Sequence, residues 1–315
     1  MAKSSRPVKA ADLGKIKRYS VAQRPTKSDI RCFGKIVKPI RPFFDSLPEF
    51  LKAAEFKKLA VDIIDAKNKG KGIIWMMGAH PLKVGLSPII IDLMDGGYIS
   101  HIAFNGACVI HDLEIAFWGK TSEEVAETLK DGAFGMVEET SLYLAQALNE
   151  SDKDSGLGSA IGEFIVKQKP KYAKYSVLHE AYKKGVSLTV HVGIGTDTIC
   201  QHPEYDAGLW GQKSHLDFRI LSSVLKSLNA GGVVLNIGSA VMLPEVFLKA
   251  LTVARNLYGK IENFTAANFD MIQHYRPNEN VIRRPLTEGG RGHSFTGHHE
   301  IMLPLLAAAI KSYER

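Results

Sequence analysis

The stretch Gly72-Ile-Ile-Trp-Met-Met-Gly78, followed by Ala-His-Pro-Leu-Lys-Val-Gly-Leu and then Ser87-Pro88, decides the fold of this chain. An apolar run ends in glycine, crosses a short polar turn and reaches Ser87-Pro88. This pair is typical of a helix start, because Ser is a good N-cap and Pro suits the first helical position. Similar strand–loop–helix units return three more times. They predict a parallel sheet whose loops converge on one edge, where α/β proteins bind ligands.

Length and composition are typical of a soluble globular protein. The chain has 315 residues, of which 45% are hydrophobic and 23% are charged. No apolar stretch approaches the roughly 20 residues of a membrane helix, and no apolar secretory-signal core follows the basic N-terminus. The three cysteines, Cys32, Cys108 and Cys200, lie far apart without a CxxC pair, which predicts reduced thiols and a cytoplasmic location.

The net charge of +7 is concentrated at the N-terminus, where residues 1–41 hold twelve Lys or Arg against two Asp. We therefore expect a basic N-terminal arm over residues 1–42 and a single domain over residues 43–315. A basic arm can bind nucleic acid or an acidic partner, but more often it is flexible or clasps an oligomer. No RNA- or DNA-binding motif is present, so we do not expect nucleic acid to be the partner.

Hydrophobic periodicity, caps and breakers predict the order of the elements. Strands are expected at 72–78, 99–104, 186–192, 233–236 and 264–272. Helices are expected at 43–69, 87–95, 108–118, 122–130, 137–149, 159–167, 176–184, 215–228, 244–256 and 300–313. Residues 150–160, 198–213 and 276–300 are expected to be loop-rich. Together these elements predict a Rossmann-like parallel sheet flanked by helices.

Four loops rich in small residues follow four of the expected strands. They contain Gly78, Asn105-Gly106-Ala107, Gly193 to Asp197, and Gly238-Ser239-Ala240. Small residues allow a ligand to approach the backbone closely, and the N-termini of the following helices favour phosphate. No loop is a complete G-x-G-x-x-G and no Walker A motif is present. As a set, the loops favour a dinucleotide as the ligand.

Histidines gather near the same edge, namely His80, His111, His191, His202, His293, His298 and His299. Their spacing fits no zinc motif, so we expect no metal site and interpret most of them as polar turn residues. His111, His191 and His298 are the candidates for a catalytic base.

Four stretches carry a resemblance to a known family. They are Phe104-Asn-Gly-Ala-Cys-Val-Ile-His-Asp-Leu113, Gly195-Thr-Asp197, Leu235-Asn-Ile-Gly238-Ser239 and Leu303-Pro-Leu-Leu306. In order and spacing, they resemble motifs of the deoxyhypusine synthase family over most of residues 50–310. Trp118-Gly-Lys120 also matches one of that family's patterns in position.

The resemblance implies the fold of that family and its chemistry. Members are tetrameric and use NAD to oxidise spermidine, capture the imine on a lysine and pass the butylamine group to a protein lysine. The resemblance therefore implies NAD as cofactor and a homotetramer. With the loop argument above, it assigns the dinucleotide site to Gly78, Asn105, Gly106, Ala107, Asp197, Gly238 and Ser239.

The chain departs from the family at the residues that do the chemistry. The nucleophilic lysine falls on Pro285, which has no amine and cannot form a Schiff base. A family glutamate is replaced by His111, a His-His pair by Met242-Leu243, and an acidic segment by Gly297-His-His-Glu300. We therefore expect the chain not to make deoxyhypusine and to take a smaller or anionic substrate.

Three hypotheses follow. The first is an NAD-dependent transferase of an alkylamine-type group, one that moves alkyl or aryl groups other than methyl; Lys83 or Lys120 would serve if an imine is trapped covalently. The second is an NAD-dependent amine or alcohol oxidoreductase. The third is a non-catalytic nucleotide-binding protein.

Overall fold

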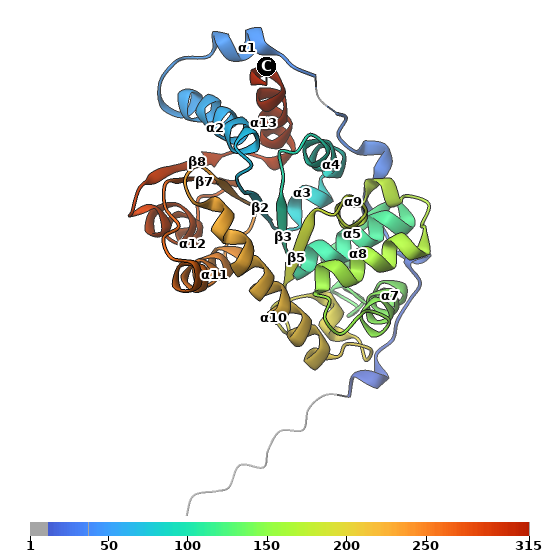
Figure 1. Ribbon diagram of the computed structural model, residues 1–315. Helices are drawn as coiled ribbons and strands as arrows, with labels where there is room; N and C mark the ends of the chain where they lie inside the picture. Colours follow the sequence, from blue (N-terminus) through green and yellow to red (C-terminus); the bar gives the residue numbers. More distant parts are fainter. Residues whose placement is uncertain (1–11, 37, 315) are drawn as a thin grey trace, which may run out of the picture.

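A six-stranded, fully parallel sheet forms the centre of the computed structural model, which describes residues 12–36 and 38–314 (Figure 1). The strands lie in the order β5-β3-β2-β6-β7-β8. Their bounds are Ile73–Met77 for β2, His101–Asn105 for β3, Ser187–His191 for β5, Val233–Ile237 for β6, Phe264–Asp270 for β7 and Gly290–Thr296 for β8. The expected α/β class with a helix-flanked parallel sheet is confirmed.

The central strand β2 explains why the sheet is covered on both faces. All five of its residues are buried. Ile73, Trp75 and Met77 belong to one hydrophobic cluster, and Ile74 and Met76 belong to a second. Because side chains alternate along a strand, the two clusters lie on opposite faces of the sheet.

Helices from different parts of the chain supply the two covering layers (Figure 1). The larger layer contains α2 (Leu51–Asn68), α4 (Ser87–Asp95), α5 (Gly106–Trp118), α7 (Glu138–Asn149), α8 (Leu157–Gln168), α9 (Val177–Lys184) and α13 (His299–Tyr313). The smaller layer contains α10 (Ala207–Val224) and α11 (Met242–Tyr258). No helix of the described ranges is long and apolar enough to cross a bilayer.

The direction of winding reverses between β2 and β6. From β2 the chain moves outward to β3 and β5; it then returns to β6 on the other side of β2 and continues to β7 and β8. Gly78 and Gly238 directly follow the two strands at this reversal. Ligands of doubly wound folds bind at the carboxyl ends of the strands at such a point. We call this carboxyl edge of the sheet the rim.

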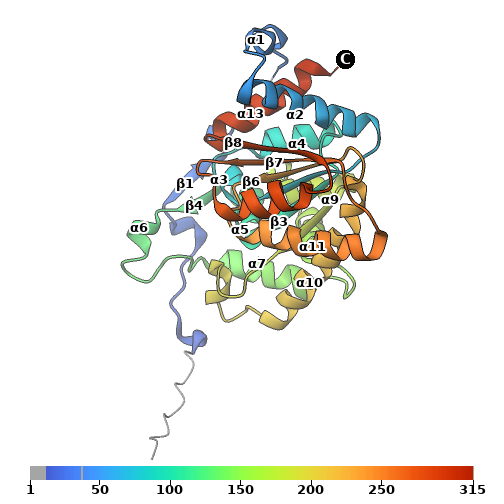
Figure 2. The same ribbon diagram turned by 90° about the vertical axis from the view of Figure 1, so that its left-hand side faces the viewer.

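From residue 18 onward the N-terminal segment runs along the body, whereas residues 12–15 are exposed (Figure 2). Its strand β1 (Thr26–Asp29) pairs antiparallel with β4 (Lys120–Glu123). Three short turns, Leu13–Lys15, Val21–Gln23 and Ile30–Cys32, and the short helix α1 (Arg41–Ser46) complete the segment. We call residues 18–24 the strap, because they run from α7 to α5. The expected arm also includes residues 1–11 and 37, which lie outside the described ranges.

Two expected helices are wrong in part. The helix expected at 122–130 is replaced by β4 and the short α6 (Val125–Thr128). The sequence from Thr121 resembles a capping motif, but Thr121 is fully buried and pairs with Ser28 of β1. The helix expected at 43–69 is divided into α1 and α2, with an irregular segment around Pro48 between them.

Two expected loops contain regular structure. The loop expected at 276–300 holds β8, and turns of helix cover Tyr275–Pro277, Asn278–Arg283 and Arg284–Leu286. The sequence did not predict β8 because the segment Gly-Arg-Gly-His-Ser-Phe-Thr has no apolar strand pattern. Only His293 and Phe295 of this strand are buried. The loop expected at 198–213 ends early, since α10 begins at Ala207, capped by Asp206.

Candidate functional site

Gly78 and Gly238 meet at the rim. The Gly78 amide donates to the Ile237 carbonyl at 2.9 Å. A Cβ added to Gly78 would fall well inside van der Waals contact with the Gly238 carbonyl oxygen. Gly238 has a φ of +67° and packs against the His299 ring. The backbones of β2 and β6 therefore approach each other at the rim more closely than any residue with a side chain would permit at position 78.

Polar groups surround this pair of glycines. The Ser239 hydroxyl accepts from the Leu243 amide at 3.1 Å, which caps the first turn of α11. The ring centroids of His80 and His299 lie 5.4 Å apart. His298 is exposed, with its Nδ1 3.7 Å from a Glu300 carboxylate oxygen. The structure brings Gly78, Gly238, Ser239 and His298 to the same edge of the sheet, and their roles in binding and catalysis stay a prediction.

A cavity of about 220 Å³ lies beside the rim. Its wall comes from the first half of α5, the start of α7, the segments 122–125, 134–137 and 196–202, Lys83, and Arg24 of the strap. The charged and polar lining side chains are Arg24, Lys83, His111, Glu114, Ser122, Glu123, Thr140, Ser141, Thr196, Asp197, Thr198 and His202.

Three of the sequence-predicted site residues, Ala107, His111 and Asp197, line this cavity together. Asn105 and Gly106 lie directly behind it. The Asn105 side chain caps α5 by accepting from the Cys108 amide at 3.1 Å, and a Cβ on Gly106 would collide with the Asp197 carboxylate. The second and third strand-end loops therefore converge on one place.

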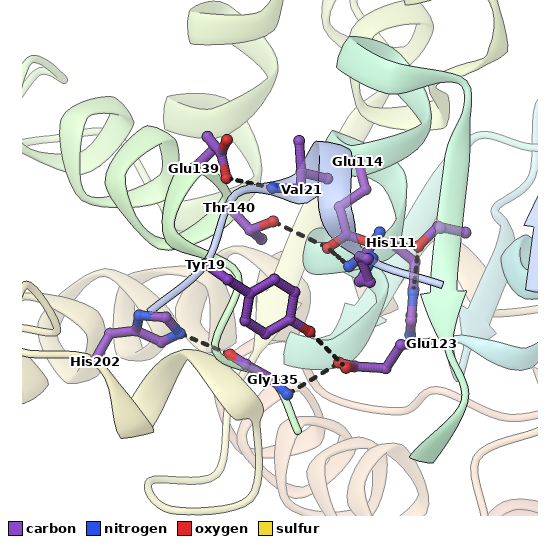
Figure 3. Close-up of polar contacts among 11 residues, drawn as sticks. Tyr19, Val21, His111, Glu114, Glu123, Gly135, Glu139, Thr140 and His202 are labelled. Carbon is purple, nitrogen blue, oxygen red and sulfur yellow. Dashed lines mark hydrogen bonds and ion pairs between the residues drawn. The ribbon is translucent and has the colours of Figure 1, made fainter. Parts of the chain in front are cut away.

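Four hydrogen bonds hold the Glu114 carboxylate in the cavity wall (Figure 3). Arg24 donates to its two carboxylate oxygens at 2.6 and 3.0 Å. Thr121 donates at 2.5 Å and Thr140 at 3.0 Å. Burial opposes ionisation of Glu114, but the charge and hydrogen bonds of Arg24 outweigh it and hold the pKa of this carboxyl below its ordinary value.

His111 contributes an imidazole ring to the cavity wall. Its Nδ1 lies 2.7 Å from the Thr121 hydroxyl oxygen. Burial lowers the pKa of His111 to about 4, although Glu114 acts in the opposite direction. The imidazole is therefore uncharged near neutral pH.

His191 lies elsewhere. At the end of β5 it is buried, with its Nε2 3.1 Å from the Thr189 hydroxyl, which His101 also contacts at 3.1 Å. Burial lowers the pKa of His191 to about 3. This histidine contributes to packing between β3 and β5 and does not line the cavity.

Two cavity residues of opposite charge have no counter-charge. Lys83 ends the short helix α3 (His80–Lys83), and its ammonium forms no ion pair with any described residue. Asp197 likewise has no cationic partner within the described ranges. Burial raises the pKa of Asp197 to about 6. Because α3 begins two residues after Gly78 and ends at Lys83, it connects the rim to the cavity.

The strap closes one side of the cavity (Figure 3). The Tyr19 hydroxyl donates to Glu123 at 3.2 Å, and the Val21 amide donates to Glu139 at 2.8 Å. Burial, together with Glu123, raises the pKa of Tyr19 to about 12. Glu123 also accepts from the Gly135 amide at 3.0 Å, and His202 Nε2 lies 2.7 Å from the Gly135 carbonyl oxygen.

One backbone conformation in the wall is unusual. Ser122, in β4, has a φ of +63°, which is uncommon for a residue with a side chain. Strained positions of this kind gather at ligand sites, where the surrounding structure holds them in place.

The other residues singled out from the sequence lie outside the cavity. Lys120 is exposed and lies 3.9 Å from an Asp29 carboxylate oxygen. Pro285 is buried in the turn before β8, where its carbonyl accepts from Arg255 at 2.8 Å. That turn lies at the amino edge of the sheet, opposite the rim. Over the described ranges, no group of three or more His, Cys, Asp or Glu could hold a metal ion.

Arg24, Glu114 and Glu123 are the charged cavity residues that sequence reasoning missed. Arg24 belongs to the expected arm, and its pairing with a residue 90 positions later leaves no local pattern. Glu114 did leave a signal, because it is a carboxylate inside the apolar helix α5. Such a residue is rarely buried without a partner.

No protein-family model matches the chain, and no curated protein does. Several solved structures share its fold. One is a conserved LOR/SDH-assigned protein from Methanococcus maripaludis S2, with 16% identity, a TM-score of 0.51, and coverage of 88% of this chain and 74% of that one. An AgrE variant bound to L-arginine has 13% identity and a TM-score of 0.52, covering 82% and 32%.

A third is a protein from Entamoeba histolytica assigned as a deoxyhypusine synthase, with 13% identity, a TM-score of 0.50, and coverage of 87% of this chain and 96% of that one. The chain spans about a third of the AgrE length, with 32% covered. At these identities the likeness establishes the fold, and the expected deoxyhypusine synthase-like fold is confirmed. Membership of that family remains a prediction.

Proposed function

We propose that this protein is an NAD-dependent enzyme that dehydrogenates a small zwitterionic amine. The observation that carries the proposal is the pair of unpaired opposite charges in one cavity, Lys83 and Asp197. Both remain desolvated to some degree without a counter-charge, and a ligand with a carboxylate and an ammonium group satisfies both. The L-arginine bound by the AgrE variant is a ligand of this chemical class.

The rim fits a dinucleotide. Gly78 and Gly238 place two strand ends side by side at the rim. The long helices α5, α11 and α13 all begin at this edge, which favours phosphate groups. The cavity of about 220 Å³ is lined by Lys83 and Asp197, whose opposite charges suit a small charged molecule. We therefore place NAD along the rim and only the small substrate in the cavity.

Bound NAD would supply the hydride acceptor. The remaining tasks fall to the chain itself. Lys83 holds the substrate carboxylate, and Asp197 holds the ammonium group and takes its proton, since a base with a pKa of about 6 is suited to neutral pH.

Transfer of the alkylamine-type group to an acceptor amine is the second candidate. The resemblance to deoxyhypusine synthases implies it, and the primary amine of Lys83 inside the cavity favours it. A homotetramer and a cytoplasmic location belong to the same proposal. The exposed apolar side chains of Ile272 and Ile301 near the rim support self-association.

Calorimetry with NAD, followed by absorbance of NADH during incubation with a panel of small amino acids and amines, tests the proposal. We expect NAD binding and NADH formation, with Lys83→Met raising KM by about tenfold or more through loss of a charge-assisted hydrogen bond. Lys120→Met is the matched control, because this lysine lies outside the cavity.

The possible outcomes separate the candidates. Absence of NAD binding contradicts the cofactor assignment. Binding without NADH formation favours a non-catalytic nucleotide-binding protein. A borohydride-trapped adduct on Lys83, found by mass spectrometry, favours transfer through a covalent imine, in which the lysine nitrogen bonds to the imine carbon and the original amine leaves.

A further inference from the structure

Two side chains of the cavity wall, Glu114 and His111, are joined by hydrogen bonds through the buried hydroxyl of Thr121. The Thr121 hydroxyl lies 2.5 Å from Glu114 Oε2 and 2.7 Å from His111 Nδ1. Glu114 and Thr121 are buried, and His111 opens on the cavity. The series joins α5 to β4 and brings together residues ten positions apart.

The chemistry of the series fixes the direction of each hydrogen bond. Glu114 is ionised, because it accepts from Arg24 twice and from Thr140, so it has no proton to give. Thr121 must therefore donate its single hydroxyl proton to Glu114. Its oxygen is then an acceptor toward His111, and Nδ1 of His111 must carry the ring proton.

The other ring nitrogen is left as an acceptor. Nε2 of His111 has no hydrogen-bond partner among the described residues, and the ring lines the cavity. The charged or titratable groups around this cavity are Arg24 on the strap, Lys83 on α3, Glu114 on α5, Glu123 on β4, and Asp197 and His202 on the segment after β5. Of these, Lys83 and Arg24 disfavour a positive charge on His111 and Glu114 favours it.

We propose that His111 is a fixed hydrogen-bond acceptor that recognises the N–H of the substrate amine, and that Thr121 and Glu114 are the positioning residues that hold its Nδ1–H tautomer. This inference rests on the proposed function for the identity of the ligand. The tautomer itself depends only on the protein.

A fixed acceptor at this place gives the cavity selectivity. An amine donates to the lone pair of Nε2, whereas a carbonyl or ether oxygen meets lone-pair repulsion there. Arg24 contributes indirectly. It keeps Glu114 ionised, and the ionised carboxylate keeps the hydroxyl proton of Thr121 directed away from His111. Through Arg24, the strap therefore influences which substrate the cavity selects.

Nitrogen NMR of the ¹⁵N-histidine-labelled protein, without cofactor or substrate, tests the tautomer. The His111 signal is identified by its loss in His111→Gln. We expect Nδ1 protonated and Nε2 unprotonated at pH 7 in the wild type and in Thr121→Ser, which keeps the hydroxyl. Thr121→Val should shift the signals toward the other tautomer. Thr128→Val is the matched control, because Thr128 donates to the Glu124 carbonyl outside the cavity.

Kinetics with the best amine substrate supply a second measurement. Thr121→Val should raise KM by about tenfold with a smaller change in kcat, and Thr121→Ser should restore it. An Nε2-protonated His111 in the wild type overturns the proposal, as does an unchanged tautomer or KM in Thr121→Val. Loss of NAD binding would leave the tautomer result untouched, so the two proposals fail separately.

Discussion

At the scale of single residues, two buried carboxyl groups show how the surroundings decide the charge state. Glu114 faces the Arg24 guanidinium and stays ionised. Asp217 of α10 accepts from the amides of Gly158 and Val190 at 3.0 and 2.7 Å, but no cation among the described residues pairs with it directly. Burial therefore prevails and raises the pKa of Asp217 to about 7.

This shift predicts a pH dependence of stability. The folded-state pKa of Asp217 lies above its ordinary value of 3.8, so its contribution is fully present below about pH 4 and is lost as the pH rises to about 7. Over that window the wild type should lose up to about 1.4 kcal/mol of unfolding free energy per pH unit relative to Asp217→Asn. Urea denaturation at pH 5, 6, 7 and 8 measures the difference. Parallel curves for the two proteins would contradict the prediction.

The candidate site could be predicted from the sequence only where local patterns mark it. Ala107, His111 and Asp197 follow strand ends, and their convergence follows from the geometry of a parallel sheet. Arg24 and Thr140 reach the same cavity from the strap and from α7. The sequence of neither segment predicts that it reaches the cavity, because these contacts depend on tertiary packing.

At the scale of elements, the close approach of the ends of β2 and β6 depends on glycines as well as on the hydrogen bonds between the two strands. Gly78→Ala would force a Cβ against the Gly238 carbonyl, and neither backbone can yield cheaply. We expect a loss of about 1–3 kcal/mol in stability and NAD binding weakened by about tenfold or more.

Thermal denaturation and NAD calorimetry of the Gly78→Ala variant measure both effects. Gly211→Ala is the control, since a Cβ at Gly211 of α10 meets nothing within 4 Å and alanine is the better helix former. It should be as stable as the wild type or more so. An alanine at position 78 that leaves NAD affinity unchanged would exclude the rim as the cofactor site.

The elements that the sequence predicted well are those with strong periodicity. The helix expected at 87–95 has those bounds in the structure, and β2 lies within the strand expected at 72–78. The missed β8 is glycine-rich and polar, and it becomes a strand only because β7 offers a parallel partner. The capping motif after Thr121 was overridden by pairing with β1, a contact that no local pattern encodes.

At the scale of the whole molecule, the rim carries apolar side chains as well as the polar groups of the site. Ile272 follows β7 and is 64% exposed, and Ile301 in the first turn of α13 is 62% exposed. Tyr275 and Val241 are exposed nearby along the same edge. Large apolar groups gathered on one edge are typical of an interface.

This arrangement predicts that the protein self-associates through the rim. Replacing both Ile272 and Ile301 with Glu would place charges in that interface, which disfavours association strongly because buried charges need partners. Sedimentation velocity should show an oligomer for the wild type and a smaller species for the double variant. Leu257→Glu is the control, since Leu257 is 64% exposed at the far end of α11, toward the amino edge of the sheet. A monomeric wild type would contradict self-association itself, and a double variant that sediments as the wild-type oligomer would place the interface elsewhere.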